Sequence, residues 1–584
     1  MSQNFFFDNF FYNFSLSIFF LLLNFIFSFV LCYKFFLKQP NYIFQNKNLA
    51  VYLIFITIIS IYTFLINFAF ILDLTKYLKF IIFFLSLFFF FYIGLFKEFK
   101  IYKYLIYKNI LLDKYILIFL FLFFLISILP LSDADSVALH LLIPAQIFQD
   151  GTLSNNLLRD LENVLLSNTE TILFFSFILK SDNFGSLLNF FSLFIFFLAF
   201  KKKSFFYIFL CSPLIIFFVS TQKLQLFFGL LYLTLFILVY ENKVKSKFEI
   251  FLFIFLLTFY SSGKLTYIFF SAFLFLFFLY KNKNFIKISF TFLFISFFFH
   301  QFPILFYKYL VFENPFVPFF DEYFNKREIL DALVHSMKST EGWYGKFDIS
   351  MIYKPFITFD LFKLATTFGL IFPLLFFNFK VNKKLFFIPY LIIISIIVSG
   401  QLLPRYYLEA YLILIFYVKY NNILKIINIF QGFFVILLSI VFLFLSFANL
   451  QKDNWSKSSF NKKFTYTYFN SEILNKKIIN QNVLLVSYDR NSLFFEKNIY
   501  SSRYLNTLNG NGTNNKNYDL NFNKFVKEAN IKYIVFENTD LRSIPSCITL
   551  DIFDEFYFKT AIRNFVVNSE EKKFLIGKIT KNDC

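Results

Sequence analysis

Long apolar runs separated by short polar loops occupy most of the chain. From residue 15 to residue 450 they recur at lengths that match the roughly 30 Å hydrocarbon core of a bilayer. Since irregular backbone cannot face lipid, each run is expected to be helical. We place about fourteen membrane-spanning helices at 15–33, 50–72, 77–97, 114–131, 184–200, 204–219, 225–241, 247–261, 265–280, 284–300, 358–378, 384–400, 404–419 and 428–448.

After residue 450 the composition becomes that of a water-soluble domain, with Asn and Lys clusters and a Gly-Asn-Gly turn. Strands are expected at 482–487, 532–537 and 574–579, and helices at 471–480 and 520–529. The sequence therefore predicts an α-helical polytopic membrane protein with a small C-terminal α/β domain. Its three parts are 1–113 (N-terminal accessory helices), 114–450 (the main bundle) and 451–584 (the soluble domain).

Basic residues gather in alternate loops and predict the orientation. Lysine clusters lie near residues 34–47, 100–108, 201–203, 243–247, 281–287 and 380–384. By the positive-inside rule these loops are cytoplasmic, so 132–182, 221–225, 261–264, 301–357, 399–405, the soluble domain and both termini face outward. The net charge of +20 is thus explained by orientation, and we expect no nucleic-acid partner. The first apolar run lacks a preceding basic region, so we expect it to be retained as a span.

The four cysteines divide between the two environments. Cys32 and Cys211 fall in or beside spans and are expected to be packing residues. Cys547 and Cys584 both belong to the outward domain, where an oxidising compartment permits disulfides. We predict a Cys547–Cys584 bridge.

The first outward loop opens with a group of polar residues directly after a span. Asp133, Asp135 and His140 lie within eight positions of one another. A pair of carboxylates here could bind a divalent cation, position a phosphate through it, or accept a proton from a hydroxyl. Ordinary capping of a helix that starts near Asp135 explains the same residues.

Other polar residues mark the outward ends of spans. Glu170 returns the first loop to the membrane, in a set that a solvated loop would explain equally well. Lys223, Lys264 and Arg405 each stand at the outward end of a span, against the inside bias of positive charge. Several converging cations would suit a phosphate headgroup, whereas each one alone could simply extend to water.

Four stretches together resemble the GT-C class of polytopic glycosyltransferases, in particular relatives of the protein mannosyltransferases and of the lipid A aminoarabinose transferase (a family 39-like pattern). They are Asp-Ser-Val-Ala-Leu-His-Leu-Leu-Ile-Pro at 135–144, Asn-Thr-Glu at 168–170, Glu-Asn-Pro-Phe-Val-Pro-Phe at 313–319, and Pro-Arg-Tyr-Tyr-Leu at 404–408. Leu139 stands where Tyr is usual, and Glu313 replaces a Gly.

The resemblance implies sugar transfer from a polyprenyl-phosphate donor to a lipid, glycan or protein acceptor at the periplasmic face of a bacterial inner membrane. In that interpretation Asp135, with Asp133 beside it, orients or deprotonates the acceptor, and His140 holds the loop against the bundle. Lys223, Lys264 and Arg405 neutralise the departing phosphate. No Walker loop, GxGxxG or HExxH motif points to another chemistry. A membrane transporter or flippase, or a noncatalytic assembly protein of surface polysaccharide synthesis, are the alternatives.

Overall fold

The computed structural model describes most of the bundle and the core of the soluble domain. The described residues are 10–32, 46–94, 113–129, 136, 140–153, 156, 158–159, 161–181, 183–200, 202–317, 320, 323–324, 367–377, 387–398, 404–418, 420–451, 481–486, 499–501, 505, 518–537, 544–559 and 571–582.

The apolar runs form helices wherever the structure describes them. The described helices of ten or more residues in the bundle are α1 (Phe10–Leu31), α3 (Lys47–Ile71), α4 (Thr75–Gly94), α6 (Lys114–Ser127), α10 (Phe184–Ala199), α13 (Gln225–Tyr240), α14 (Lys247–Ser262), α15 (Tyr267–Lys281), α16 (Ile286–His300), α17 (Phe302–Phe312), α21 (Phe387–Val398), α22 (Leu408–Tyr417) and α23 (Asn422–Gln451). Shorter ones are α7 (Leu142–Asp150), α8 (Asn168–Leu173), α9 (Phe175–Ile178), α11 (Lys203–Leu210), α12 (Leu214–Val219) and α20 (Ile371–Phe377), with 3-10 turns η3 (Leu161–Leu165), η4 (Lys283–Phe285) and η8 (Pro404–Tyr407).

Fewer helices reach membrane-spanning length than the sequence predicts. By length and composition four of the described helices could cross a bilayer: α1, α3, α4 and α23. Helices α16 and α17, bent by 54°, would make a fifth if they form one broken span. The run expected at 204–219 is divided into α11 and α12 before Pro213, whose ring cannot continue the preceding helix.

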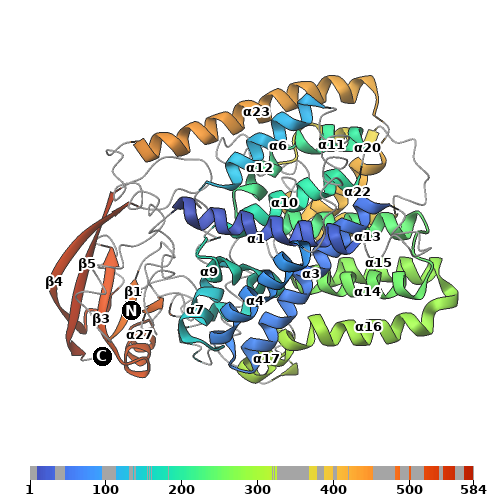
Figure 1. The fold of residues 1–584 in the computed structure, drawn as a ribbon. Coiled ribbons are helices and arrows are strands. Elements are labelled where there is room, and N and C mark those ends of the chain that lie inside the picture. Colours follow the sequence, from blue (N-terminus) through green and yellow to red (C-terminus); the bar gives the residue numbers. More distant parts are fainter. Residues whose placement is uncertain are drawn as a thin grey trace.

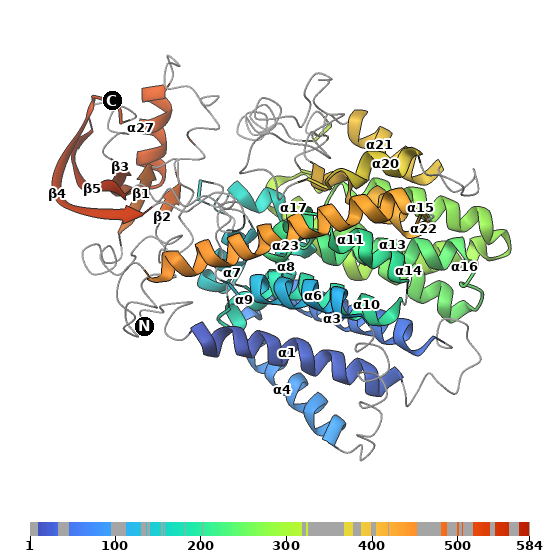
Figure 2. The same cartoon turned by 90° about the horizontal axis from the view of Figure 1, so that it is seen from above.

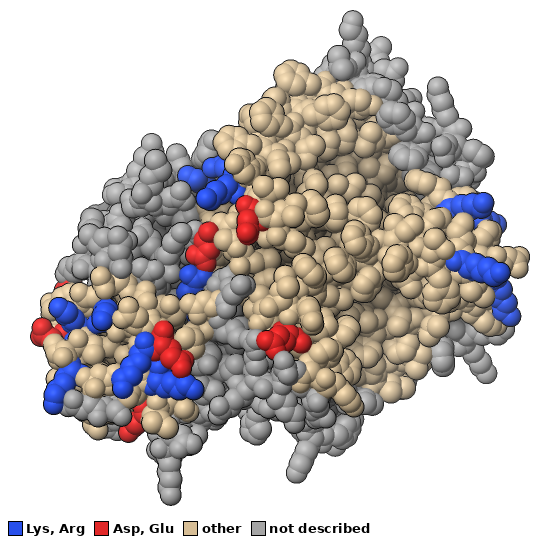
Figure 3. Space-filling view, turned by 90° about the horizontal axis from the view of Figure 1, so that it is seen from below, with Lys and Arg blue, Asp and Glu red and all other residues tan. Residues whose placement is uncertain are grey.

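The long helices run roughly along one axis, with the sheet of the soluble domain at one end (Figure 1). Helix α23 lies across the bundle, and α4 forms its outer edge (Figure 2). Phenylalanines on the outer helices face away from the core: Phe80 is 62% exposed, Phe294 75% and Phe430 73%. Figure 3 shows a broad area without charged side chains over the bundle, with Lys and Arg at the end away from the sheet and a mixture of both charges at the sheet end. This distribution suits lipid around the bundle.

Each end of the bundle has its own set of contacts between segments that are distant in the sequence. At the end away from the sheet, the Lys202 ammonium donates to the carbonyl of Phe416, and the rings of Tyr240 and Tyr417 lie 5.0 Å apart. At the sheet-side end, the first loop contacts the turns that precede α13 and α15. Among the described residues, Lys202 and Tyr240, next to loops assigned inward, therefore lie at the opposite end from Gln222 and Gly263, in turns assigned outward.

The soluble domain is built on a five-stranded sheet in the order β2-β1-β3-β5-β4. The strands are β1 (Asn482–Val486), β2 (Ile499–Ser501), β3 (Ile531–Glu537), β4 (Ile548–Lys559) and β5 (Glu571–Asn582), with α27 (Tyr518–Glu528) leading into β3. Strands β1, β2 and β3 are parallel, and β5 joins β3 and β4 antiparallel. The expected strands at 482–487, 532–537 and 574–579 are present, whereas β2 and β4 were not expected. The helix expected at 471–480 lies outside the described residues.

The cysteines have different states in the two parts. Cys32 and Cys211 are buried free thiols in the bundle. Cys547 forms a disulfide and packs partly buried against the core of the soluble domain. Its expected partner, Cys584, lies outside the described residues.

Candidate functional site

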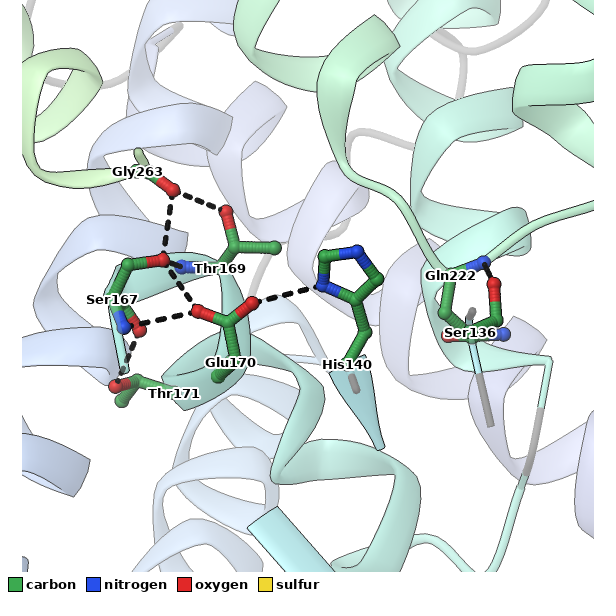
Figure 4. A network of polar contacts seen from close by, with 8 residues as sticks. All are labelled: Ser136, His140, Ser167, Thr169, Glu170, Thr171, Gln222 and Gly263. Carbon is green, nitrogen blue, oxygen red and sulfur yellow. Dashed lines mark hydrogen bonds and ion pairs between the residues drawn. The ribbon is translucent and has the colours of Figure 1, made fainter. Parts of the chain in front are cut away.

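Two hydrogen bonds anchor the first loop of the bundle, at 132–182, on the helices. The Ser136 hydroxyl accepts a bond from the backbone N–H of Gln222 at 2.9 Å, and His140 Nδ1 donates to Glu170 Oε1 at 2.9 Å. Figure 4 shows the His140 ring between Glu170 on one side and the Ser136–Gln222 bond on the other. Asp133 and Asp135 lie outside the described residues, but Ser136 follows Asp135 directly.

Glu170 is the centre of this anchor. It is buried in the first turn of α8, where its other oxygen accepts the backbone N–H of Ser167 at 3.0 Å and completes a capping box. The hydroxyls of Ser167 and Thr169 both donate to the carbonyl of Gly263, at 2.8 and 2.6 Å. The set is therefore packed into the bundle, and the alternative of a solvated loop is excluded for these residues.

Hydrogen bonds between amide and hydroxyl side chains connect α8 to the neighbouring helices α3 and α14. Asn67 of α3 donates to Asn168 Oδ1 at 2.7 Å and accepts from the Thr171 hydroxyl at 2.7 Å. Asn168 in turn donates to the Ser262 hydroxyl. Because buried polar groups are costly unless paired, these bonds define one position for the segment that carries Glu170.

The three predicted cations lie within electrostatic range of one another. The Lys264 ammonium lies 4.2 Å from the centre of the Tyr406 ring, and the guanidinium carbon of Arg405 lies 5.5 Å from it. Buried Lys223, 4.8 Å from the Phe217 ring, adds a third charge that acts on Lys264. Burial, reinforced by the charges of Arg405 and Lys223, lowers the pKa of the Lys264 ammonium. We call Lys223, Lys264 and Arg405 the cationic cluster.

The turns that carry Lys223 and Lys264 also form the hydrogen bonds that hold the first loop. Lys264 follows Gly263, whose carbonyl accepts the bonds from Ser167 and Thr169. Lys223 follows Gln222, which bonds Ser136 and whose Oε1 accepts the N–H of Gly185 at 2.7 Å. A Cβ at position 185 would lie 2.3 Å from that Oε1, so only glycine permits this approach.

Two buried ionisable residues near the site were not identified from the sequence. Glu409, in the first turn of α22, accepts a hydrogen bond from the Tyr260 hydroxyl at 3.0 Å. The Lys308 ammonium donates to the carbonyl of Val317 at 3.4 Å and interacts electrostatically with Glu170. Both stand inside apolar runs. Because an ionisable residue in such a run is costly unless it is paired or functional, both could have been identified from the sequence.

Among the described residues, no three His, Cys, Asp or Glu side chains are grouped so that they could hold a metal ion. His140 Nδ1 is occupied by Glu170, and the two aspartates proposed as ligands lie outside the part described.

Compared with protein-family models, with curated proteins and with solved structures, the chain matches none.

Proposed function

We propose that the chain is a GT-C-type membrane glycosyltransferase with about fourteen spans. It would move a sugar from a polyprenyl-phosphate donor to a lipid, glycan or protein acceptor at the periplasmic face of a bacterial inner membrane. The observation that carries this proposal is the cationic cluster, which lies beside the anchored first loop. Ser136, the residue that follows the candidate acid Asp135 in the sequence, bonds the residue that precedes Lys223 in this cluster.

The reaction needs few groups because the donor is already activated. The acceptor hydroxyl attacks C1 of the sugar, the bond from C1 to the phosphate oxygen breaks, and its electron pair stays on the lipid phosphate. Asp135, with Asp133 beside it, would orient the hydroxyl and take its proton. Lys223, Lys264 and Arg405 would stabilise the charge that develops on the phosphate. His140 would hold the loop through Glu170 at the distance the transfer requires.

Transfer of radiolabelled sugar from total lipid-linked donors tests the proposal. Membranes carrying the wild-type chain are compared with Asp133→Asn and Asp135→Asn variants at matched expression. We expect the wild type to transfer label and Asp135→Asn to lose transfer while remaining folded. Repetition with EDTA and with added Mg²⁺ tests whether the aspartates act through a divalent ion. Absence of transfer by the wild type across several donor pools would favour the transporter or the assembly protein.

A further inference from the structure

Three helices begin at the cationic cluster and pack against one another there. Helices α13, α15 and α22 each start shortly after a turn that carries one of the cations. The rings of Phe228 in α13 and Tyr267 in α15 lie 5.8 Å apart. A Cβ at Gly229 of α13 would lie 2.8 Å from the side chain of Leu408, the first residue of α22. Since Lys264 also lies over a ring of η8 at 4.2 Å, the three turns meet at one place.

The same three turns carry buried polar atoms that lack a hydrogen-bond partner within the described part of the chain. We call these residues the neutral polar set: Thr221, Gln225, Thr266 and Tyr407. Thr221 and Gln225 stand on either side of the first cation, and Thr266 and Tyr407 each follow one of the other two. Thr221, Gln225 and Tyr407 are buried as whole residues.

Unpaired polar atoms at one buried place indicate a ligand. A buried hydroxyl or amide oxygen without a partner is costly, and most such atoms in folded proteins are paired. The neutral polar set gathers this cost in the turns that hold the cations, where a bound molecule could supply the missing bonds. The set consists of three hydroxyls and one amide oxygen, so it offers both donors and acceptors without charge.

The chemistry of the set matches the part of the donor that adjoins the phosphate. In a polyprenyl-phosphate sugar, the sugar is bonded directly to the phosphate that the cations would hold. Sugar hydroxyls donate and accept hydrogen bonds, as the neutral polar set does. A sugar that carries an ammonium group would instead be repelled by the three nearby cations.

We propose that the neutral polar set is the sugar subsite of the cationic cluster and binds an uncharged sugar through its hydroxyls. This inference rests on the proposed function and deepens it, since it names the class of sugar that is transferred. The four residues bind the donor, whereas the candidate acid remains in the first loop.

Binding of charge-matched lipids to the purified full-length protein tests the inference. The probes are polyprenyl phosphates esterified with glucose, mannose, galactose or 4-amino-4-deoxyarabinose, together with the methyl ester, which carries the same phosphodiester charge and no sugar. We expect at least one of the three uncharged hexose lipids to bind on the order of tenfold more tightly than the methyl ester. The amino-sugar lipid should bind more weakly than that hexose lipid.

Two substitutions remove members of the set and keep the side-chain volume close to that of the wild type. Tyr407→Phe and Gln225→Met should each weaken binding of the preferred hexose lipid by about tenfold and leave the methyl ester unchanged. Because neither removed group has an internal hydrogen bond, the midpoint of thermal unfolding without ligand should stay the same or rise.

Tyr417→Phe is the matched control because it removes another buried, unpaired hydroxyl, at the opposite end of the same helix α22. It should leave the binding of every lipid unchanged. Unchanged hexose binding in both Tyr407→Phe and Gln225→Met would overturn the inference while the proposed function stands.

Three further results contradict the inference. Equal binding of all the sugar lipids and the methyl ester by the wild type would mean that no sugar is held. Tightest binding of the amino-sugar lipid would assign the wrong class of sugar, and a lowered thermal midpoint in both Tyr407→Phe and Gln225→Met would give these groups a structural role. A wild type that binds the methyl ester no better than the free polyprenol would overturn the proposed function and this inference together.

Discussion

Asn156 of the first loop donates a hydrogen bond to the Tyr500 hydroxyl of the soluble domain, at 3.3 Å and across 344 residues of sequence. Leu158 of the same loop packs against the core of that domain. These contacts place the loop and the domain together, which requires an even number of membrane crossings between them.

A cross-link between these two positions tests that arrangement in membranes. We expect Asn156→Cys and Tyr500→Cys, introduced together, to be joined by a short bismaleimide cross-linker, because the hydrogen bond holds the two side-chain ends together while the length of the tyrosine side chain makes a direct disulfide unsuitable. The cross-linked peptide is identified by mass spectrometry. Asn156→Cys paired with Lys281→Cys, at the other end of the bundle, is the control and should give no bridge. Labelling of positions 156 and 500 from opposite sides by a membrane-impermeant maleimide would contradict the arrangement.

Loss of the His140–Glu170 hydrogen bond should lower both thermal stability and sugar transfer. We expect Glu170→Gln and His140→Gln each to lower thermal stability, with a coupling free energy of about 1 kcal/mol in a double-mutant cycle, because the pair is largely shielded from water. Sugar transfer should fall by about tenfold or more, since the loop that carries Asp135 loses its anchor.

The Asp150–Arg159 ion pair of the same loop offers the control for this prediction. Asp150→Asn removes a comparable interaction away from the anchor and should leave transfer within about twofold of the wild type. Equal loss of transfer in Asp150→Asn and Glu170→Gln would mean that general loosening of the loop, rather than this anchor, is responsible.

The sequence predicted the elements of the bundle better than their lengths. Apolar runs mark a helix such as α3 because lipid leaves the backbone no alternative, but composition alone does not show that the run at 204–219 breaks before Pro213. Residues 168–178 were expected to belong to the outward loop 132–182, yet they form the buried helices α8 and α9. Their polar side chains bond partners more than 90 positions away, such as Asn67 and Gly263, and such pairing is not visible in local patterns.

The three cations of the candidate site were predicted because they stand where the positive-inside rule disfavours positive charge. Lys223, Lys264 and Arg405 stood out because each breaks the inside bias of positive residues, and the structure brings them together. Glu409 carried the same kind of signal within an apolar run, but its hydrogen-bond partner is Tyr260 of another helix. Spacing along the sequence cannot show which side chain of a distant helix a buried carboxylate contacts.

Binding of polyprenyl phosphate should weaken at a lower pH than the ordinary pKa of a lysine ammonium would predict. The pKa of Lys264 is lowered by burial, and its charged form binds phosphate, so affinity is lost as pH rises through that lowered value. Lys264→Arg should keep the affinity at higher pH because a guanidinium stays charged. Titration of polyprenyl phosphate binding between neutral pH and about pH 10 measures the difference.

Lys243→Arg, at the opposite end of the bundle, is the control for that titration and should leave the wild-type profile unchanged. If Lys264→Arg loses affinity over the same pH range as the wild type, another group controls the binding and Lys264 does not contact the phosphate.

Glu313 ends α17 in the left-handed backbone region, with φ of 57°. The related pattern places glycine at this position, and the structure gives the reason, since a side chain in this conformation costs about 1 kcal/mol. We expect Glu313→Gly to raise the midpoint of thermal unfolding in detergent by about 1–2 °C, part of the relieved strain being offset by the freedom of glycine in the unfolded chain. Glu313→Ala separates the backbone from the side chain: it removes the carboxylate, keeps the Cβ and should not stabilise. If Glu313→Ala stabilised as much as Glu313→Gly, the carboxylate rather than the backbone would be the source of the strain, and glycine would hold no advantage at this turn.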